Sequence, residues 1–182
     1  YALARVRFRG RTLMLLTILA VSMFPQIAVL AGLFEMVRAA GLYNSLFSLI
    51  FAYMIFTLPF TVWVLTTFMR ELPVEIEEAA MVDNVPSWRI FTGIVVPMSL
   101  PGLVATFLIT LSFVWNEFLF ALFLTTSSWQ TLPILVAGQN SQRGDEWWAV
   151  SAAVLIAIAP MIVMAGILSR MMRSGLLLGA IK

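Results

Sequence analysis

Five long stretches of this sequence contain no charged residue, and they limit the environments in which the chain can fold. The stretches are residues 12–34, 39–69, 90–116, 118–142 and 147–169. Each is at least as long as the roughly 20 apolar residues that a helix needs to cross a bilayer. Charged residues make up only 11% of the chain, whereas a soluble domain carries about 25%. The sequence therefore predicts an integral membrane protein with one domain over residues 1–182.

The apolar stretches predict helices rather than strands. Every backbone polar group inside a bilayer must find a partner within the protein, and the two-residue alternation of a barrel strand is absent from this sequence. We therefore expect an all-α, polytopic transmembrane helix bundle with spans at about 12–34, 46–69, 98–125 and 148–170. The third predicted span includes Glu117, because the apolar pattern continues to Leu124.

Several prolines lie inside or beside these spans: Pro25, Pro59, Pro97, Pro101 and Pro160. A proline removes a backbone donor and tends to kink a helix. Two interpretations remain open from the sequence. The kinks are tolerated in a packed bundle, or they bend helices around a transport pathway.

The positive charges are distributed unequally between the two sides of the predicted bundle. Four arginines precede the first span, two lie between the second and third, and three Lys or Arg residues follow the fourth. The other side has only Arg38 and Arg143. Because Lys and Arg gather on the cytoplasmic side, we predict that both ends of this chain and the loop 70–92 are cytoplasmic. The loop from Thr125 to Trp148 is then external.

The loop 70–92 is unusually acidic. It holds five of the nine acidic residues of the chain, namely Glu71, Glu75, Glu77, Glu78 and Asp83. A segment with so many charges belongs in water and is predicted to touch something there. Pro73 suits the first turn of a helix, and carboxylates just after it favour the helix N-terminus.

The spacing of Ile76, Ala79 and Ala80 predicts that they share one face of this short helix. Two alanines would leave a shallow surface on which another protein can pack. Asn84 tolerates the left-handed conformation that ends a helix. A second turn, from Pro86 to Phe91, would follow. An ordinary solvated loop remains an alternative, whereas a helix lying on lipid is disfavoured because anionic headgroups would repel its acidic face.

This loop resembles the signature loop of the permease subunits of ATP-binding cassette importers. That pattern has Glu-Ala-Ala, three residues, Gly, nine residues, Ile, one residue and Leu-Pro. Here Glu78-Ala79-Ala80, Asp83, Ile94 and Pro97 match it, while Asn84 replaces the Gly and Val96 replaces the Leu. Further stretches are similar to the carbohydrate branch, the maltose-permease-like proteins: residues 1–5, 8–10, 41–44, 59–60, 115–118, 131–133, 175 and 179–182.

The resemblance implies a type I importer permease of six spans, with two spans before Tyr1 and four in this piece. It implies that the loop 70–92 contains a coupling helix, and that the ATPase contacts are Glu78, Ala79, Ala80, Asp83 and Asn84. The implied partners are a second permease subunit, two ATPase subunits and an extracytoplasmic solute-binding protein. The implied location is the bacterial inner membrane, and the implied solute is a sugar or polyol that the sequence does not name.

The resemblance also implies that this chain is not an enzyme and binds no cofactor, because ATP and Mg²⁺ belong to the partner ATPases. In agreement, the sequence has no Gly-rich phosphate loop ending in Lys and Ser or Thr. The net charge of +2 gives no argument for nucleic acid as a partner.

A second candidate site is the sequence Trp115-Asn116-Glu117. An ionisable residue at the centre of a span costs about 2.5–3.5 kcal/mol on insertion scales and usually faces protein or water. Asn116 and Glu117 would line the substrate pathway or its gate, with Trp115 offering an aromatic face to a sugar. Alternatively, Glu117 pairs with a neighbouring helix and only stabilises the bundle. The sequence leaves both interpretations open.

Other kinds of membrane protein fit the sequence less well. An ion-coupled secondary transporter, the main alternative, would need ionisable residues at mid-membrane and usually repeat symmetry. Glu117 is alone within its predicted span. The chain has no His and no Cys and no pair of intramembrane carboxylates, so an intramembrane protease lacks its catalytic groups. A passive scaffold whose loop binds a partner without moving also remains open.

Overall fold

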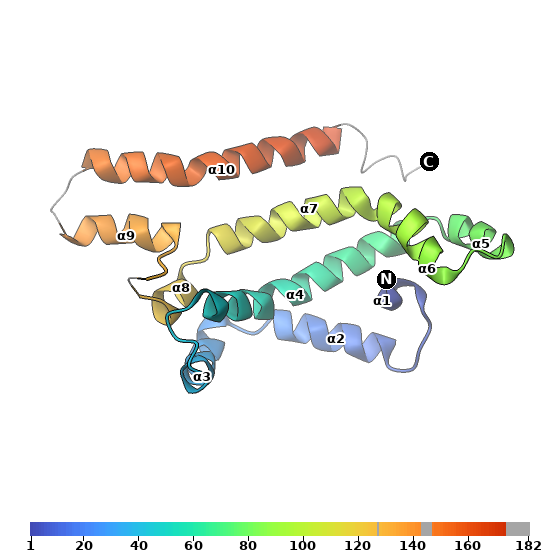
Figure 1. The fold of residues 1–182 in the computed structure, drawn as a ribbon, viewed down its shortest axis with the longest axis horizontal. Coiled ribbons are helices and arrows are strands. Elements are labelled where there is room, and N and C mark those ends of the chain that lie inside the picture. The colour runs from blue at the N-terminus through green and yellow to red at the C-terminus, as the bar shows by residue number, and fades with distance from the viewer. Residues whose placement is uncertain (127, 143–146, 174–182) are drawn as a thin grey trace.

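The computed structural model describes residues 1–126, 128–142 and 147–173, and every regular element in these residues is a helix. This confirms the all-α prediction (Figure 1). In chain order the helices are α1 (Ala2–Arg5), α2 (Arg11–Ser22), α3 (Gln26–Ala39), α4 (Leu46–Glu71), α5 (Val74–Val82), α6 (Ser87–Ile90), the π-helical turn η1 (Phe91–Val95), α7 (Val96–Trp115), α8 (Leu119–Leu124), α9 (Leu132–Gln142) and α10 (Trp147–Arg173).

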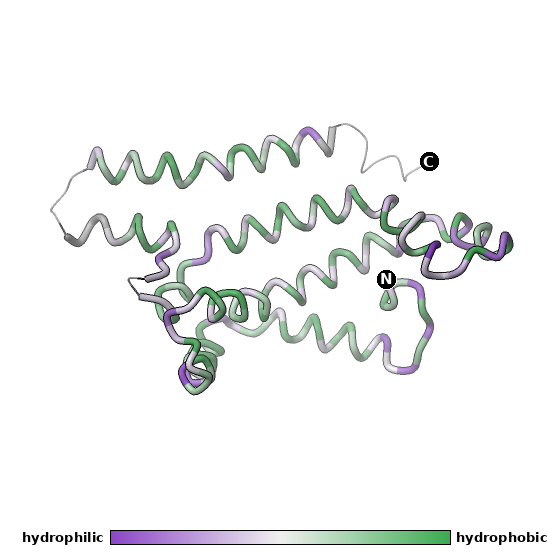
Figure 2. The backbone as a smooth tube through the Cα atoms, viewed as in Figure 1, coloured by the Kyte–Doolittle hydropathy of each residue, from purple (hydrophilic) through white to green (hydrophobic). Residues whose placement is uncertain are grey.

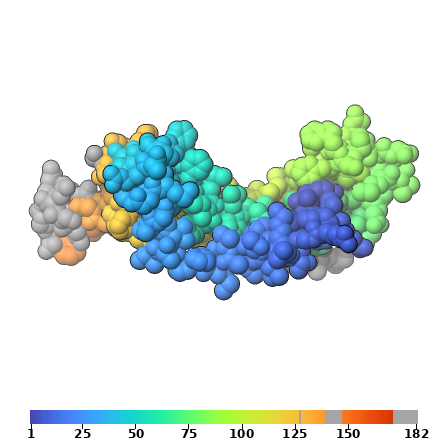
Figure 3. All heavy atoms as spheres, turned by 90° about the horizontal axis from the view of Figure 1, so that it is seen from below, coloured from blue at the N-terminus to red at the C-terminus, as the bar shows by residue number. Residues whose placement is uncertain are grey.

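The axes of the long helices α2, α4, α7 and α10 are roughly parallel, and the chain runs along successive ones in alternating directions (Figure 1). Helix α4 packs against α2 on one side and α7 on the other, and α10 packs against α7 and α9. The short helices gather at the two ends, with α1, α5 and α6 at one and α3, α8 and α9 at the other. Apolar residues dominate the long helices, and hydrophilic residues concentrate toward the ends (Figure 2). Figure 3 shows that α3 and the α5–α6 loop rise on the same side, which leaves a hollow between them.

Three helices are long and apolar enough to cross a membrane, and a bent pair can form a fourth span. Helix α4 coincides with the second predicted span, and Trp147–Arg170 coincides with the fourth. The third apolar helix runs over Ser87–Trp115. The prediction that this helix continues through Glu117 to residue 125 is therefore wrong. Helix α8 is a separate short helix, and the region predicted as an external loop contains α9.

The first predicted span, residues 12–34, is two helices rather than one. Helices α2 and α3 meet at an angle of 92°. Pro25 immediately precedes α3 and has an extended backbone, with φ −66° and ψ 128°. An extended residue without an N–H cannot continue the hydrogen bonding of α2. Pro25 thus lies at a sharp bend between two helices. Pro59, Pro101 and Pro160 instead lie inside helices that continue past them.

Helices α4 and α7 approach each other very closely at Gly102. A Cβ atom at this position would lie 2.5–2.7 Å from three ring atoms of Phe68. Farther along the same pair, the Thr61 and Thr110 hydroxyl oxygens are 3.3 Å apart. Small residues allow helices in a membrane to pack at short distance. The pair α4–α7 is therefore held in one arrangement, and it places the α5–α6 loop that joins the two helices.

Candidate functional site

The turn after α5 is a Schellman motif with asparagine in the glycine position. Asn84 has φ +56°, which confirms the predicted left-handed conformation. The Val85 N–H donates to the Ala80 carbonyl at 3.1 Å, and the Asn84 N–H donates to the Met81 carbonyl at 3.1 Å. These two bonds satisfy carbonyls that a helix end otherwise leaves open. Asn84 thus forms this turn at the position where the signature that the loop resembles has glycine.

Substitutions at Asn84 test how far the loop depends on this turn. We expect Asn84→Gly to keep the loop intact, because glycine adopts positive φ without strain. We expect Asn84→Val to destabilise it by about 1–2 kcal/mol, the usual cost of a left-handed backbone for residues other than Gly, Asn and Asp. Limited proteolysis of the loop in the purified protein measures the difference. Equal protease resistance of the two variants would contradict this account.

Ala79 and Ala80 point in different directions. Ala79 is exposed, whereas Ala80 is only 8% exposed and packs with Ile90 and Val95. The prediction that both alanines lie on one open face is therefore wrong for Ala80. Consecutive residues on a helix do not share a face, and α6 covers the Ala80 side of α5. Ala80 fixes the spacing between α5 and the start of the next long helix.

A contact between α1 and α5 buries one of the five acidic side chains of the loop. Glu77 is 5% exposed. Its Oε1 accepts a hydrogen bond from Arg5 Nε at 2.7 Å, and its Oε2 accepts one from the Tyr1 hydroxyl at 2.8 Å. Arg5 Nη2 also donates to the Leu72 carbonyl at 2.8 Å. We call these four residues the α1–α5 contact. Desolvation and the hydrogen bond to Glu77 raise the pKa of the Tyr1 hydroxyl above its ordinary value.

The sequence prediction grouped Glu77 with the water-facing acids and missed this contact. In the structure, the exposed face of the loop combines acidic and large apolar side chains. Glu78 and Asp83 are exposed, and beside them in the sequence Val82 is 80% exposed. In the second turn Trp88 is 71% exposed, whereas Phe91 packs on the Tyr1 ring with centroids 5.1 Å apart. Exposed apolar groups rimmed by charge are typical of a protein-binding surface.

The second candidate site lies where α7 ends. The Glu117 carboxylate accepts hydrogen bonds from the backbone N–H groups of Phe120 at 2.8 Å and Ala121 at 3.3 Å. A side-chain acceptor for these N–H groups favours a new helix start, which is why α8 is separate from α7. Asn116 Nδ2 donates to the Ser112 carbonyl at 2.8 Å. Trp115 Nε1 donates to the Ala157 carbonyl of α10 at 3.0 Å.

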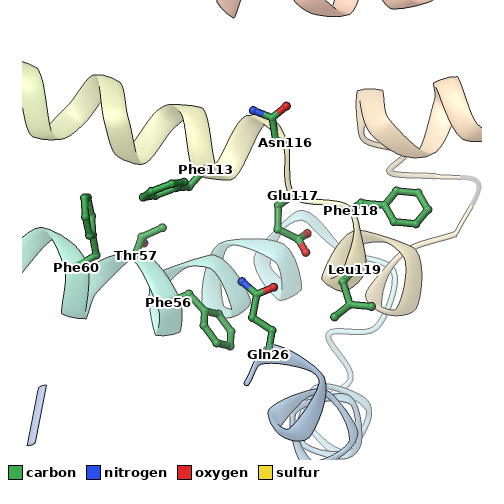
Figure 4. A pocket seen from close by; sticks show the side chains of 9 residues that line it. All are labelled: Gln26, Phe56, Thr57, Phe60, Phe113, Asn116, Glu117, Phe118 and Leu119. Carbon is green, nitrogen blue, oxygen red and sulfur yellow. The ribbon is translucent and has the colours of Figure 1, made fainter. Parts of the chain in front are cut away.

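Asn116 and Glu117 line a cavity of about 550 Å³ between α3, α4, α7 and α8. Its other lining residues, none of which the sequence analysis identified, are Gln26, Phe56, Thr57, Phe60, Phe113, Phe118 and Leu119. Glu117 and Gln26 point toward each other across the cavity, while Asn116 points outward at its edge (Figure 4). Phe60 and Phe113 form an edge-to-face pair with centroids 5.2 Å apart. The cavity therefore combines aromatic walls with a few polar groups.

The structure separates Trp115 from this cavity. Trp115 lines a neighbouring hollow of about 360 Å³ instead, together with residues of α9 and α10. Of the three residues predicted as one site, Glu117 lines the first cavity, Trp115 lines the neighbouring hollow, and Asn116 lines both. Gln26, Phe56, Thr57 and Phe60 come from distant parts of the sequence, so no pattern around Glu117 marks them, whereas Phe113 and Phe118 lie within a few residues of it.

Parts of two sequence predictions lie outside the described residues. Residues 127 and 143–146 belong to the predicted external loop, and residues 174–182 include Gly175 and the segment 179–182. Within the described part, Asn44 links the start of the external region to the turn before α4. Its Oδ1 accepts from the Thr126 N–H at 2.9 Å, and its Nδ2 donates to Ser128 Oγ at 3.1 Å.

Comparisons with known proteins agree on one family. The model of the binding-protein-dependent transport system inner membrane component matches residues 1–175. The trehalose/maltose transport system permease protein MalG of Thermococcus litoralis is 36% identical over 184 residues, which cover all of this chain and 66% of that protein. The trehalose transport system permease protein SugB of Mycobacterium tuberculosis is 35% identical over 185 residues, covering all of this chain and 68% of that protein.

A third relative is the diacetylchitobiose uptake system permease protein DasC of Streptomyces coelicolor. It is 34% identical over 183 residues, which cover all of this chain and 66% of that protein. This chain spans about two thirds of the length of these relatives. Its apolar helices and the matched family make it a multi-pass protein of the inner membrane. The chain therefore belongs to the family of binding-protein-dependent transport system inner membrane components, as its resemblance to importer permeases predicted.

Proposed function

We propose that this chain is a permease subunit of an ATP-driven importer for a sugar or related polyol. Its partners in this proposal are a second permease subunit, two ATPase subunits and an extracytoplasmic solute-binding protein. The observation that carries the proposal is the α5–α6 loop, which projects from the end of α4 and α7 with an exposed acidic and apolar face (Figure 1). The names of the relatives, which mention trehalose, maltose and diacetylchitobiose, support a carbohydrate as solute.

In this proposal the partner ATPase binds the loop through Glu78, Ala79, Asp83 and Asn84. Ala80 is the fifth residue implied by the family pattern. It lies on the buried side of α5 and lets this helix pack against α6 and η1. ATP and Mg²⁺ are bound by the ATPase subunits, so this chain moves when ATP binding closes those subunits and does not itself catalyse hydrolysis. The loop and both ends of the piece face the cytoplasm. Arg5, Arg70 and Arg89 lie at this end of the helices, which supports that orientation.

The proposed substrate pathway includes the cavity beside Glu117. Binding sites for small molecules are mostly apolar or aromatic, with a few polar groups that fix orientation. Phe56, Phe60 and Phe113 supply the aromatic part, and Gln26 and Glu117 supply polar groups. Trp115 holds α7 to α10 through its hydrogen bond to Ala157, so we assign it a structural role at the edge of the pathway.

No observation favours the ion-coupled alternative. Both oxygens of the Glu117 carboxylate accept backbone hydrogen bonds at the start of α8. These bonds hold the carboxylate against the first turn of α8, whereas an ion-coupled carboxylate must release and rebind its proton or cation in each cycle. In this proposal Glu117 lines the cavity and accepts hydrogen bonds from the hydroxyl groups of a solute.

The test of the proposed function is uptake by the whole complex in proteoliposomes. We expect uptake of a sugar or polyol to require ATP and the binding protein, and to continue when ion gradients are collapsed. Residues 1–182 contain no cysteine, so Asp83→Cys introduces a single thiol into this part of the protein for crosslinking. It should capture the ATPase subunit. Uptake that depends on an ion gradient, or no crosslink to an ATPase, would refute the proposal.

Glu117→Gln tests the pathway assignment. The glutamine amide keeps the shape of the side chain and one acceptor oxygen. A helix cap contributes about 1 kcal/mol, and we expect α8 to lose only a fraction of that stability. We expect uptake to fall about tenfold or more, because an aligned charged acceptor for solute hydroxyls contributes about 1.5–3 kcal/mol and about 1.4 kcal/mol corresponds to a factor of ten. Uptake and melting temperature are measured on the same preparation. Parental uptake in this variant would remove Glu117 from the pathway and leave it a helix cap only.

A further inference from the structure

The α1–α5 contact joins two segments that are 72 residues apart in the sequence. The charged side chains of Arg5 and Glu77 are only 12% and 6% exposed. Dehydrating two charges offsets much of their attraction, so a buried ion pair is weak evidence for stability. Its geometry is specific, however, because Glu77 receives donors from Arg5 and Tyr1 on separate oxygens. The contact therefore fixes the position of α1 relative to α5.

Arg5 also fixes the angle between α5 and α4. These helices are joined by Leu72 and Pro73, whose backbones are both extended. A short extended link contains no helical hydrogen bond, so rotation about a few single bonds would let α5 swing. Arg5 Nη2 binds the Leu72 carbonyl while Arg5 Nε binds Glu77. One guanidinium thus connects the link to the helix that follows it.

The same network reaches α2. Arg11, the first residue of α2, donates from Nε to the Leu3 carbonyl at 2.9 Å and from Nη2 to the Ala4 carbonyl at 2.9 Å. These carbonyls lie at the end of α1, where a helix leaves acceptors open. Glu77, Arg5 and Arg11 therefore link α5 to α1 and α1 to α2 by side-chain hydrogen bonds. In Figure 3, α1 (dark blue) lies against the α5–α6 loop (green).

Helix α2 ends near the cavity. It runs along α4 to the 92° bend, and Gln26, the first residue after the bend, lines the cavity. A displacement of α5 can therefore reach the cavity in two ways. One runs through α4 and α7, which are continuous with the loop. The other runs through the α1–α5 contact and α2 to Gln26.

We propose that the α1–α5 contact is a second transmission route from the coupling loop to the solute cavity, with Arg5 and Glu77 as its positioning residues. The contact stays closed through the transport cycle, so that α1 and α2 move together with α5. This inference rests on the proposed function, since a partner ATPase must move the loop. It predicts that opening the contact lowers uptake per ATP hydrolysed rather than ATP hydrolysis itself.

The first test compares Arg5→Ala with Arg7→Ala in the reconstituted complex. Both variants remove one positive charge from the same segment, but Arg7 is exposed. We expect uptake per ATP hydrolysed to fall about fivefold or more in Arg5→Ala, the lower end of typical coupling between distant sites. We expect Arg7→Ala to keep the parental ratio. Equal ratios in the two variants would overturn the inference.

A second experiment, with a pair of cysteines, tests the inference if Arg5→Ala fails to fold. The complex carrying Arg5→Cys and Glu77→Cys is assembled with a short reversible bis-methanethiosulfonate linker between the two thiols, and reductant then removes the linker from the folded complex. We expect near-parental uptake per ATP with the linker and about fivefold less after reduction. An unchanged ratio after reduction overturns the inference, and so does a linked complex that hydrolyses ATP without uptake. A parent complex without ATP-dependent uptake would instead refute the proposed function itself.

Discussion

Replacing Ala79 by tryptophan is expected to reduce ATP-driven uptake by about tenfold or more, which corresponds to about 1.4 kcal/mol of lost docking free energy. Ala79 is exposed on α5, next to Glu78. A partner can approach the helix backbone closely only while this side chain is small. An indole would hold the ATPase away without disturbing the inner side of α5. The measurement is uptake in proteoliposomes, together with co-purification of the ATPase subunit.

Ala80→Leu is the matched comparison for that prediction. Ala80 faces Ile90 and Val95, and added carbons in a packed cluster typically cost about 1–3 kcal/mol. We expect this variant to lose uptake as well, but with a lower melting temperature and faster proteolysis of the loop. Ala79→Trp should keep the parental values of both. If Ala79→Trp supports normal uptake with normal ATPase binding, the exposed face of α5 is not the docking surface.

Gly102→Leu is expected to destabilise the protein by about 1–3 kcal/mol through overpacking and to abolish uptake. Any Cβ at this position would lie 2.5–2.7 Å from the Phe68 ring, so the ring or a whole helix must move. Because α4 and α7 carry the two ends of the α5–α6 loop, a shift of either helix also displaces the loop. Thermal unfolding in detergent, followed by uptake measurements, checks both effects.

Two further variants separate the contact with Phe68 from the general effect of losing a glycine. Gly32→Ala places a Cβ in open space in the middle of α3, and we expect it to be neutral or slightly stabilising, because alanine is the better helix former. Gly102→Ala combined with Phe68→Leu should be more stable than Gly102→Ala alone. A double variant no more stable than the single one would show that Phe68 is not the limiting neighbour.

The turn at Asn84 could be predicted because its cause is local. The tolerance of asparagine for positive φ is a property of one residue, and the structure has it at φ +56°. The presence of the long apolar helices was predictable for a similar reason, since the exclusion of charge from a bilayer acts on each segment separately. Helix α4 and the apolar helix Trp147–Arg170 accordingly coincide with their predicted spans.

Other features depend on contacts that hydropathy and spacing do not contain. Glu77 is buried because Arg5 approaches it from 72 residues away, and no local pattern distinguishes it from Glu78. The predicted end of α7 lies too far along the chain, because apolar residues continue past Glu117. In the structure, the Glu117 carboxylate accepts hydrogen bonds from the N–H groups that start α8. The cavity was only partly foreseen, since its walls come from four helices.

The corner between α2 and α3 decides which part of this subunit can be in contact with lipid tails. The N–H groups of Met23 and Phe24 donate to the Ala20 and Val21 carbonyls at the end of α2, but the N–H groups of Gln26 and Ile27 have no partner within α3. Hydrocarbon cannot satisfy them, so irregular backbone at membrane depth is tolerated only against protein or water. Where this corner lies at membrane depth, protein or water must therefore cover it, and Gln26 does line the cavity. An uninterrupted helix such as α10 satisfies most of its backbone internally and can face lipid along its length.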